Sequence, residues 1–362
     1  MLTQRALNRA LLARQLLLAR TRMPIEQAVT HLVGLQAQKP DPPHIGLWSR
    51  VAGVRHCDID ELIEHRRLVR VAAMRSTIHL LSADDGVRLR PVIQPVLDRE
   101  LRAQTFRSLR WVDVNAVTTR GRELCESRPL SFADLGQALV AEFPRADAHA
   151  LAIAVRNNCV LVQIPPRGRW RTPAPTVHVP AASWLHRPEH NDPDPAPLVL
   201  RYLRAFGPAT SPDIARWCGL QGIKLVLERL RDELRWFTDD RGRTLADVPD
   251  GILPDPDTPA PVRFLPEYDN ALLSHADRTR IIADGDRPAV FTRNGQVEGT
   301  VLVDGYVRAT WRTVTQERQE TISVRPLCQL SNGARADIER EALLLLDFAS
   351  RGREHRVEFR AG

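Results

Sequence analysis

Hydrophobic and polar positions along the chain repeat one order of elements three times, and the third copy shows it most clearly. Apolar residues at helical spacing occupy 198–206, and the hydroxyl of Thr210, followed by a first-turn proline, provides the N-cap of a second helix. A helix expected over 223–234 precedes an apolar hairpin that turns across 239–242. Helix, turn, helix and hairpin is the order of a winged helix, so this pattern predicts a winged-helix unit.

Two earlier copies follow the same order more loosely. In the second copy, helices over 131–139 and 147–158 lead to a strand over 160–164 and a turn at 165–168. In the first copy, helical spacing gives way to a hairpin, and these elements are expected over 2–20, 24–35, 58–66 and 69–81. The three copies together predict winged-helix units in tandem.

After Pro266 the pattern changes from helical to strand spacing. An Asn-Gly pair at 294–295 and an Asp-Gly pair at 304–305 separate short alternating runs, and such pairs strongly favour tight hairpin turns. A late helix is expected over 336–349 and a last strand over 357–360. The tail therefore predicts a small antiparallel sheet or barrel.

Length and composition indicate several folded domains. A chain of 362 residues exceeds what one hydrophobic core usually supports, and 43% hydrophobic with 26% charged residues is typical of folded globular proteins. Nine prolines fall between residues 165 and 197, and six fall between 249 and 266. Both clusters are expected to form extended connections.

The net charge of +7 is unevenly distributed. Residues 1–130 hold 21 Lys and Arg against 13 Asp and Glu, whereas residues 131–362 hold 30 against 31. A basic N-terminal third is typical of a surface that binds a phosphate backbone or an anionic membrane. The alternative is an arginine-rich composition without a polyanionic partner, since only Lys39 and Lys224 among the 51 basic residues are lysines.

The cysteines and the hydropathy of the chain indicate in which cellular compartment the protein is expected. The five cysteines are scattered and include no Cys-x-x-Cys pair, so neither a disulfide framework nor a zinc knuckle is indicated. Residues 1–20 carry internal arginines and lack the apolar run of a signal peptide, and no stretch approaches the roughly 20 apolar residues that span a bilayer. We therefore expect a cytoplasmic protein without a membrane partner.

One segment, from His186 to His190, matches the His-x-x-Glu-His motif of some zinc enzymes. Zinc binding through this motif requires both histidines on one face of an intact helix, and Pro188 lies inside the segment. The sequence also contains no phosphate-binding loop, dinucleotide fingerprint, nucleophile elbow or calcium loop. It therefore predicts no metal and no cofactor.

A more specific feature is the Gln-x-Gln motif of Gln36 and Gln38, where the helix expected over 24–35 ends. Continuing the apolar period of that helix puts Gln36 on the buried side, where its amide must find partners. Pro40 disfavours helix at the residue before it, so Gln38 lies at or beyond the last turn. The two amides either point into a polar space or merely cap the helix and hold neighbouring loops.

Five segments carry a resemblance to a known family. They resemble, in the same order, segments of the tandem winged-helix DNA glycosylases of the AlkZ and YcaQ family, over essentially the whole chain. The segments are Gln36 to Gln38, His44 to Arg50, Met74 to Leu80, Leu265 to Asn270 and Ser274 to Arg278.

The resemblance implies an α+β fold in which three tandem winged-helix domains are followed by a C-terminal antiparallel β-barrel, arranged around DNA. Together with the proline-rich connections, it divides the chain into four parts. Winged helix 1 with the Gln-x-Gln motif is expected at 1–125, winged helix 2 at 126–180, a linker with winged helix 3 at 181–250, and the barrel at 251–362.

The resemblance also implies that the motif serves catalysis, with Gln36 and Gln38 at the matching positions. A carboxamide cannot act as a base near neutrality, so two glutamines can orient water and stabilise developing charge but cannot remove a proton. Such a site suits a base that already carries positive charge, such as an N7- or N3-alkylated purine. Glu267 and Asp269 are the alternative catalytic pair, unless they form a solvated turn or an ion pair with Arg278.

We therefore expect a monofunctional DNA glycosylase that excises alkylated purines, including bulky toxin adducts or crosslinks, in DNA repair or self-resistance. Its partner is damaged double-stranded DNA, and it is expected to act as a monomer at the nucleoid. The alternative is a non-enzymatic winged-helix regulator or lesion-binding protein, although regulators usually dimerise and the chain has no heptad-bearing dimer helix. The residues expected to contact DNA are Lys39, Arg50, Arg75, His79, Arg167, Arg169, Arg241 and Arg243.

Overall fold

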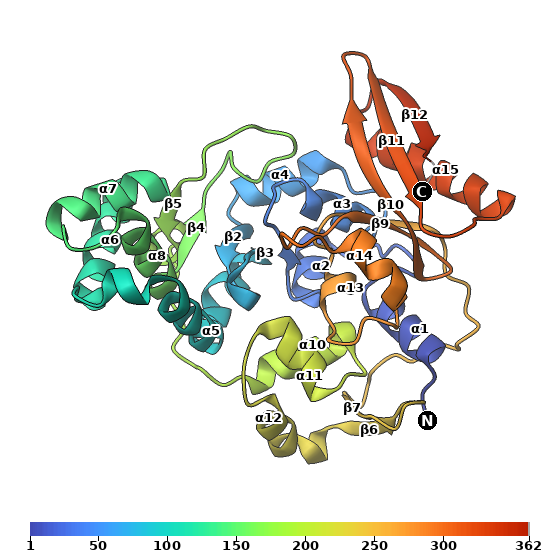
Figure 1. The fold of residues 1–362 in the computed structure, drawn as a ribbon, viewed down its shortest axis with the longest axis horizontal. Coiled ribbons are helices and arrows are strands. Elements are labelled where there is room, and N and C mark those ends of the chain that lie inside the picture. The colour runs from blue at the N-terminus through green and yellow to red at the C-terminus, as the bar shows by residue number, and fades with distance from the viewer. Residues whose placement is uncertain (361–362) are drawn as a thin grey trace.

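The structure is a computed structural model that describes residues 1–360. Its described residues form a mixed α/β fold with two five-stranded sheets and one two-stranded ribbon. Figure 1 shows the chain in four regions, with the N-terminal region in the middle and the C-terminal sheet projecting from it. The order of the regions follows the order of the sequence.

The N-terminal region begins with a helix and ends with a hairpin. Its elements are α1 (Gln4–Arg14), α2 (Ile25–His31), β1 (Leu35–Gln36), α3 (Pro42–Trp48), α4 (His56–Glu64), β2 (Leu68–Ala72), the 3-10 turn η1 (Met74–Ser76) and β3 (Ile78–Ser82). The helix predicted over 24–35 ends at His31, because Val33 and Gly34 take left-handed conformations with φ of 55° and 83°. The chain then enters β1, which pairs antiparallel with β3. The Gln-x-Gln motif thus begins in a strand, and its prediction at a helix end is wrong.

The second region packs helices against a continuation of the same sheet. Its elements are α5 (Ala83–Leu109), α6 (Val114–Ser127), α7 (Phe132–Glu142), α8 (Ala148–Asn158), β4 (Leu161–Gln163), β5 (His178–Pro180) and α9 (Ala181–Leu185). The sequence patterns did not predict α5, which contains Pro91 and Pro95 in its interior. β4 pairs with β2 of the N-terminal region, so one sheet of order β1-β3-β2-β4-β5 joins the first two hairpin regions. The segment between β4 and β5 runs back over α4 (Figure 1).

The third region agrees with its sequence pattern. Its elements are α10 (Ala196–Phe206), α11 (Ser211–Cys218), α12 (Ile223–Arg229), the 3-10 turn η2 (Arg231–Glu233), β6 (Arg235–Thr238) and β7 (Thr244–Asp247). Thr210 accepts a hydrogen bond from the Asp213 backbone N–H, and the Asp213 side chain accepts one from the Thr210 backbone N–H. This capping box satisfies two N–H groups that a helix start leaves without partners. Because the cap and the turn are encoded within a few residues, local sequence was sufficient to predict this region.

The C-terminal region is an open sheet and not a closed barrel. Its elements are β8 (Arg263–Leu265), α13 (Asn270–Leu273), the 3-10 turn η3 (Asp284–Asp286), α14 (Arg287–Val290), β9 (Gly299–Val303), β10 (Tyr306–Thr315), β11 (Gln319–Pro326), α15 (Asn332–Ala349) and β12 (Glu354–Phe359). Within the described chain, the edge strands β8 and β12 of the order β12-β11-β10-β9-β8 do not pair with each other. The predicted antiparallel barrel is therefore wrong. Because α15 connects β11 to β12 as a crossover, β12 pairs parallel to β11, and α15 packs on the sheet.

One hydrophobic cluster joins the N-terminal, third and C-terminal regions. It includes Leu11 of α1, Phe206 of α10 and Leu272 of α13, all fully buried. A buried ion pair adds a polar link, because Arg14 of α1 donates two hydrogen bonds of 2.6 and 2.8 Å to Asp247 of β7. The first helix therefore holds the third and fourth regions against each other.

No helix in residues 1–360 combines the length and the apolar character required to cross a membrane.

Candidate functional site

A cleft of about 910 Å³ lies where distant parts of the chain converge. Residues of β1, η1, α5 and α11 line it together with residues 268–278 and the turn at 295–297. Of the predicted site residues, Gln36 and Arg75 lie in its wall. A second groove, of about 630 Å³ between α4 and α15, contains none of the predicted site residues. The cleft is therefore the candidate site.

Gln36 is buried at one end of the cleft. Its side chain is 8% exposed, and its Oε1 accepts a hydrogen bond of 2.7 Å from Nη2 of Arg75. The sequence correctly predicted that this amide is buried with a polar partner. The backbone of Gln36 pairs with His79 of β3, which fixes the position of the glutamine in the sheet.

Gln38 is exposed and lies two residues further along the same strand-like segment. The backbone N–H of Ala37 donates to the carbonyl oxygen of Ile78, so pairing with β3 continues beyond β1. Gln38 Oε1 accepts a long hydrogen bond of 3.4 Å from the Ile78 backbone N–H. This contact holds Gln38 beside the start of β3, and Gln38 is not among the residues that line the cleft.

Lys39 and Glu267 form an ion pair beside the motif, with 2.5 Å between Nζ and Oε2. Burial opposes protonation of Lys39, but the hydrogen bond and the charge of Glu267 outweigh burial and raise the pKa of the amine. The pair brings the segment after β8 next to the Gln-x-Gln motif. The carboxylate of Glu267 and the ammonium of Lys39 thus lie against each other beside the motif.

Asp269 and Arg50 do not occupy the predicted roles. Arg50 is fully buried and donates two hydrogen bonds of 2.8 Å to Asp269, which is 4% exposed. Asp269 also caps α13 by accepting from the Ala271 backbone N–H. A guanidinium in this position cannot reach DNA, and the carboxylate that it holds is buried away from solvent. Both predictions are corrected: the two residues form a structural ion pair.

Arg75 and His79 also lie beside the motif, Arg75 partly exposed in the cleft wall and His79 buried. Arg75 donates to Trp217 and to Gln36, so its hydrogen bonds remain inside the protein. Burial and the nearby Arg75 charge lower the pKa of His79 to about 3, and its Nδ1 lies 3.0 Å from the Thr77 carbonyl oxygen. A neutral, 1% exposed imidazole does not attract a phosphate. The predicted DNA contact by His79 is therefore wrong.

The arginines of the second predicted wing tip fold back onto the protein. Arg169 lies 3.0 Å from Glu64 of α4, and Arg167 donates a hydrogen bond of 3.3 Å to the Ala174 carbonyl oxygen. The backbone N–H of Trp170 donates to Asp60 of the same helix. The segment is therefore anchored along α4 and does not project as a tip.

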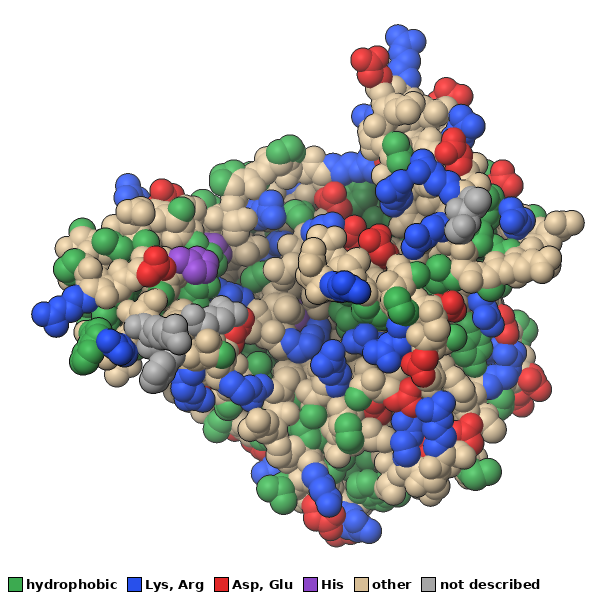
Figure 2. Space-filling view, viewed as in Figure 1, with side chains coloured by type: hydrophobic (Ala, Val, Ile, Leu, Met, Phe, Trp, Pro, Cys, Tyr) green, Lys and Arg blue, Asp and Glu red, His purple; other side chains and the backbone are tan. Residues whose placement is uncertain are grey.

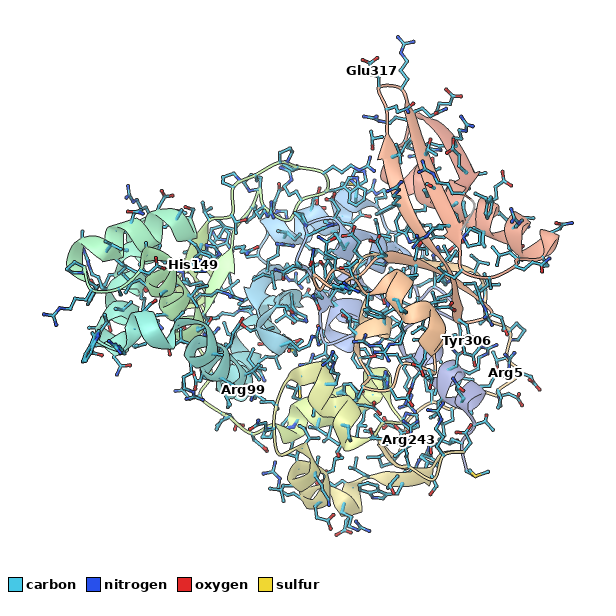
Figure 3. All side chains as sticks on the ribbon, viewed as in Figure 1. Arg5, Arg99, His149, Arg243, Tyr306 and Glu317 are labelled. Atoms are coloured by element: carbon cyan, nitrogen blue, oxygen red, sulfur yellow. The ribbon has the colours of Figure 1, made fainter. Side chains whose placement is uncertain are left out.

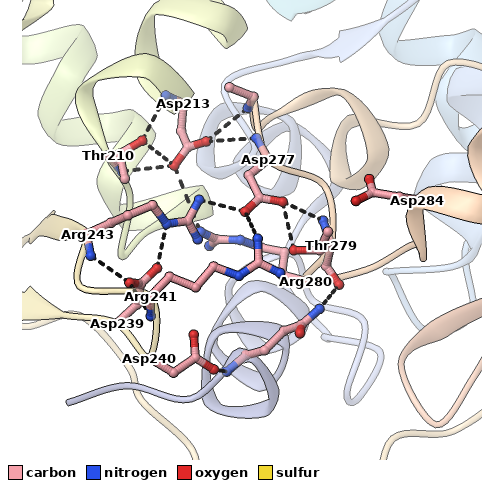
Figure 4. A network of polar contacts seen from close by, with 12 residues as sticks. Thr210, Asp213, Asp239, Asp240, Arg241, Arg243, Asp277, Thr279, Arg280 and Asp284 are labelled. Carbon is pink, nitrogen blue, oxygen red and sulfur yellow. Dashed lines mark hydrogen bonds and ion pairs between the residues drawn. The ribbon is translucent and has the colours of Figure 1, made fainter.

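The arginines of the third predicted wing tip have acidic partners. Arg241 and Arg243 lie 3.1 and 2.6 Å from Asp277, and Arg243 also contacts Asp239 at 2.7 Å. Figure 4 shows these ion pairs continuing to Asp213, so the hairpin is bound to α11 and to the segment after α13. Their charges are largely balanced within the protein.

A cluster of arginines that the sequence reasoning did not single out for DNA contact lines the cleft instead. Arg278 is 7% exposed, and burial together with the charges of Arg216 and Arg287 lowers its pKa to about 10. Among the described residues, its Nε has no hydrogen-bond partner, and its guanidinium lies 4.2 Å from the centre of the Phe291 ring. Figure 2 shows Lys and Arg side chains gathered near the centre of this face. Arg216 and Arg278 show no ion pair among the described residues, and like charges held close together favour an anionic ligand.

Arg99 extends the cluster from the other wall. It projects from α5 toward the third region (Figure 3), and its Nη2 donates a hydrogen bond of 2.6 Å to the Gly219 carbonyl oxygen. Arg278 is the last residue of a segment that carries the family resemblance, and that resemblance is the sequence signal that could have identified it. Arg216 and Arg99 had no sequence signal, because only the packing of α11 against α5 brings them together.

The His186 to His190 segment does not form a zinc helix. His186 ends α9 with φ of 53°, and Glu189 lies 3.5 Å from Arg122. Within residues 1–360, no group of three His, Cys, Asp or Glu side chains is arranged to hold a metal ion.

Comparisons with known proteins agree on one family. A family model described as DNA glycosylase AlkZ-like matches residues 29–348. A curated protein described as an interstrand DNA cross-link repair glycosylase, from Streptomyces sahachiroi, is 25% identical over 334 residues, which cover 84% of this chain and 86% of that protein. The solved structure of Streptomyces sahachiroi DNA glycosylase AlkZ matches with a TM-score of 0.81 and 21% identity over the whole of both chains. At this identity, the structural match concerns the fold.

The buried pair of Arg50 and Asp269 yields a stability prediction. Arg50→Ala leaves the Asp269 carboxylate buried without its charge partner, and we expect a loss of about 3–5 kcal/mol in the free energy of unfolding, measured by urea denaturation. Arg55→Ala, which removes the exposed ion pair with Asp58, is the control and should change stability little. Equal effects of the two variants would contradict a structural role for Arg50.

Proposed function

The chain belongs to the AlkZ-like DNA glycosylase family, and we propose that it hydrolyses the N-glycosidic bond of cationic N7- or N3-alkylated purines in DNA. Bulky toxin adducts and interstrand crosslinks fall within this class, so the biological role is DNA repair or self-resistance. The observation that carries the proposal is a buried glutamine amide, that of Gln36, in the wall of an arginine-lined cleft.

The chemistry available at the motif supports a cationic substrate. The departing base must accept the electron pair of the C1′–N bond, and a neutral base needs a proton to do so. Gln36 and Gln38 supply dipoles but no proton, whereas Glu267 is paired with Lys39 and Asp269 is buried with Arg50. An alkylated purine that already carries positive charge leaves without an acid, so positioning and electrostatic stabilisation suffice.

The charge of the cleft supports binding of the DNA backbone. Arg216 is exposed on α11, and Arg278 faces it without an acidic partner among the described residues. Arginines in this arrangement bind phosphate through charge-assisted hydrogen bonds. We therefore place the phosphate contacts at the cleft, in preference to Arg167, Arg169, Arg241 and Arg243, which have partners in the protein.

We further propose that the first three regions are winged-helix units in tandem, with the domain boundaries given by the proline-rich connections. The element order of the third region supports this assignment. In the first two regions, the shared sheet replaces two separate wings. The same proposal has the enzyme act as a monomer on double-stranded DNA of the nucleoid.

The glutamine motif provides the central test. Gln36→Ala and Gln38→Ala should each reduce release of N7-alkylguanine from DNA by about 10- to 1,000-fold, with DNA affinity nearly unchanged. The measurement is single-turnover release of free base. Gln163→Ala is a matched control, because Gln163 is also a strand residue that accepts from an arginine, Arg70, but lies outside the cleft. If both motif variants excise as fast as the parent, the catalytic assignment fails.

Substrate class is tested separately. Because the motif supplies no proton, the parent enzyme should excise N7-alkylguanine and act poorly on uracil or 8-oxoguanine in the same duplex. Gln38→Asp adds a carboxylate beside the developing oxocarbenium ion and should preserve or raise the rate. Efficient release of uracil by the parent would contradict the proposed dependence on a cationic leaving group.

The reaction should stop at base release and leave the abasic strand intact. A lyase needs an unprotonated amine to form a Schiff base, and the ion pair with Glu267 raises the pKa of Lys39. Borohydride should therefore trap no covalent adduct between the protein and DNA. A trapped adduct that disappears in Lys39→Ala would show that the enzyme is bifunctional.

The phosphate contacts are tested through salt dependence. Arg216→Ala and Arg278→Ala should each lower the slope of log binding constant against log salt by about 0.9, the value for one neutralised phosphate. Arg351→Ala serves as the control, because this side chain is 85% exposed outside the cleft. The double variant Arg241→Ala, Arg243→Ala should leave the slope close to that of the parent. An unchanged slope in both cleft variants would remove the cleft from the DNA-binding surface.

A further inference from the structure

Arg75 connects two walls of the cleft through one guanidinium group. Its Nη2 donates a hydrogen bond of 2.7 Å to Oε1 of Gln36, and its Nη1 donates to the carbonyl oxygen of Trp217. Trp217 lies in the last turn of α11, where helix carbonyl groups lack intrahelical partners and attract cations. Arg75 therefore fixes the amide of the N-terminal region to the end of a helix of the third region.

The backbone at Arg75 is held in an unusual conformation. Arg75 and the next residue, Ser76, both have positive φ, at 55° and 57°. Consecutive non-glycine residues rarely adopt this conformation, and such strain persists only where the surroundings impose it. α11 packs closely here, since a Cβ on Gly219 would lie 3.5 Å from Cα of Arg75. The turn at η1 is therefore shaped to deliver this side chain between β1 and α11.

The contact with Arg75 determines which end of the Gln36 amide can still bind a ligand. A guanidinium has only donors, so the amide atom that faces it must be the oxygen. Among the described residues, Gln36 Nε2 has no hydrogen-bond partner, and Gln36 lines the cleft. The amide thus offers N–H groups to a ligand.

The geometry points to Arg75 as a positioning residue that orients Gln36 so that its NH₂ group donates a hydrogen bond to the departing purine. This inference rests on the proposed glycosylase function and names the part that one glutamine takes in it. A cationic hydrogen bond to the amide oxygen polarises the amide and strengthens its N–H groups as donors.

The reaction step is consistent with a donor at this position. The C1′–N9 bond breaks, and its electron pair moves to the purine, whose positive charge is neutralised. Water forms the new bond to C1′ and loses its proton to solvent. An N–H donor directed at a ring nitrogen or exocyclic oxygen of the purine stabilises the electron density that arrives there. Gln38, whose amide is exposed, is left to orient the water.

Arg75→Lys tests the positioning role, because it keeps the positive charge but cannot bridge two acceptors in the same fork geometry. We expect the single-turnover rate of N7-alkylguanine release to fall about 10- to 100-fold, with less than about threefold change in DNA affinity. Arg90→Lys is the matched control, because Arg90 is buried and also donates to a glutamine oxygen, of Gln94, and to main-chain carbonyl oxygens. Its folded form should retain the parent rate. A parent-like rate in Arg75→Lys would overturn the inference.

Gln36→Glu tests the donor role without loss of the contact to Arg75. The carboxylate can still accept from the guanidinium, but it presents an oxygen where the amide presented NH₂. The rate should fall at least as far as in Gln36→Ala, while thermal melting shows a folded protein. A rate equal to that of the parent would mean that the oxygen, and not the NH₂ group, serves the reaction.

A double-variant comparison separates this inference from the proposed function. If Arg75 acts through Gln36, adding Arg75→Lys to Gln36→Ala should slow release no further. If the two losses multiply, Arg75 acts independently and the positioning role is wrong, although the catalytic role of Gln36 stands. If Gln36→Ala alone has no effect, both the proposed role of the motif and this inference fall.

Discussion

The cleft depends on the buried ion pair between Arg50 and Asp269. Arg50 lies just after α3 and Asp269 just before α13, so the pair joins segments that are distant in the sequence. Burying two charged groups away from solvent costs free energy unless they pair with each other. Here both hydrogen bonds between Arg50 and Asp269 are 2.8 Å long. The segment after β8 is therefore fixed in one position. The neighbouring Asn270 extends the link by donating to the carbonyl oxygen of Gly34, in the turn that precedes β1.

Fixing this segment determines the chemistry of the motif. With Asp269 held by Arg50, Glu267 lies against Lys39, so each of the two candidate catalytic carboxylates has a cationic partner. The same arrangement removes Lys39 as a free amine, because its pKa is raised. The groups of the motif without a charged partner of opposite sign are therefore the two neutral amides of Gln36 and Gln38. Under the proposed function, these amides would stabilise charge by position and not by proton transfer, which would favour substrates with good leaving groups.

Whether an arginine is available to DNA depends in the same way on its partners within the protein. An arginine-rich sequence does not by itself produce a DNA-binding surface, because most of the predicted contacts have an internal partner. Arg169 contacts Glu64, and Arg241 contacts Asp277. No ion pair of Arg216 or Arg278 is seen among the described residues, and their neighbouring positive charges in the cleft wall favour an anion. Local charge balance, and not the number of basic residues, marks the cleft.

The sequence by itself determined the features that are encoded within a few neighbouring residues. The cap at Thr210, the hairpin of β6 and β7 and the burial of Gln36 were predicted correctly. Tertiary structure decided the rest. Pairing with β3 turned the expected helix end into β1, and the α15 crossover left the C-terminal sheet open. The partners of Arg50 and Arg75 lie in other segments, and only packing of the whole chain selects which charges are buried together and which remain free for a ligand.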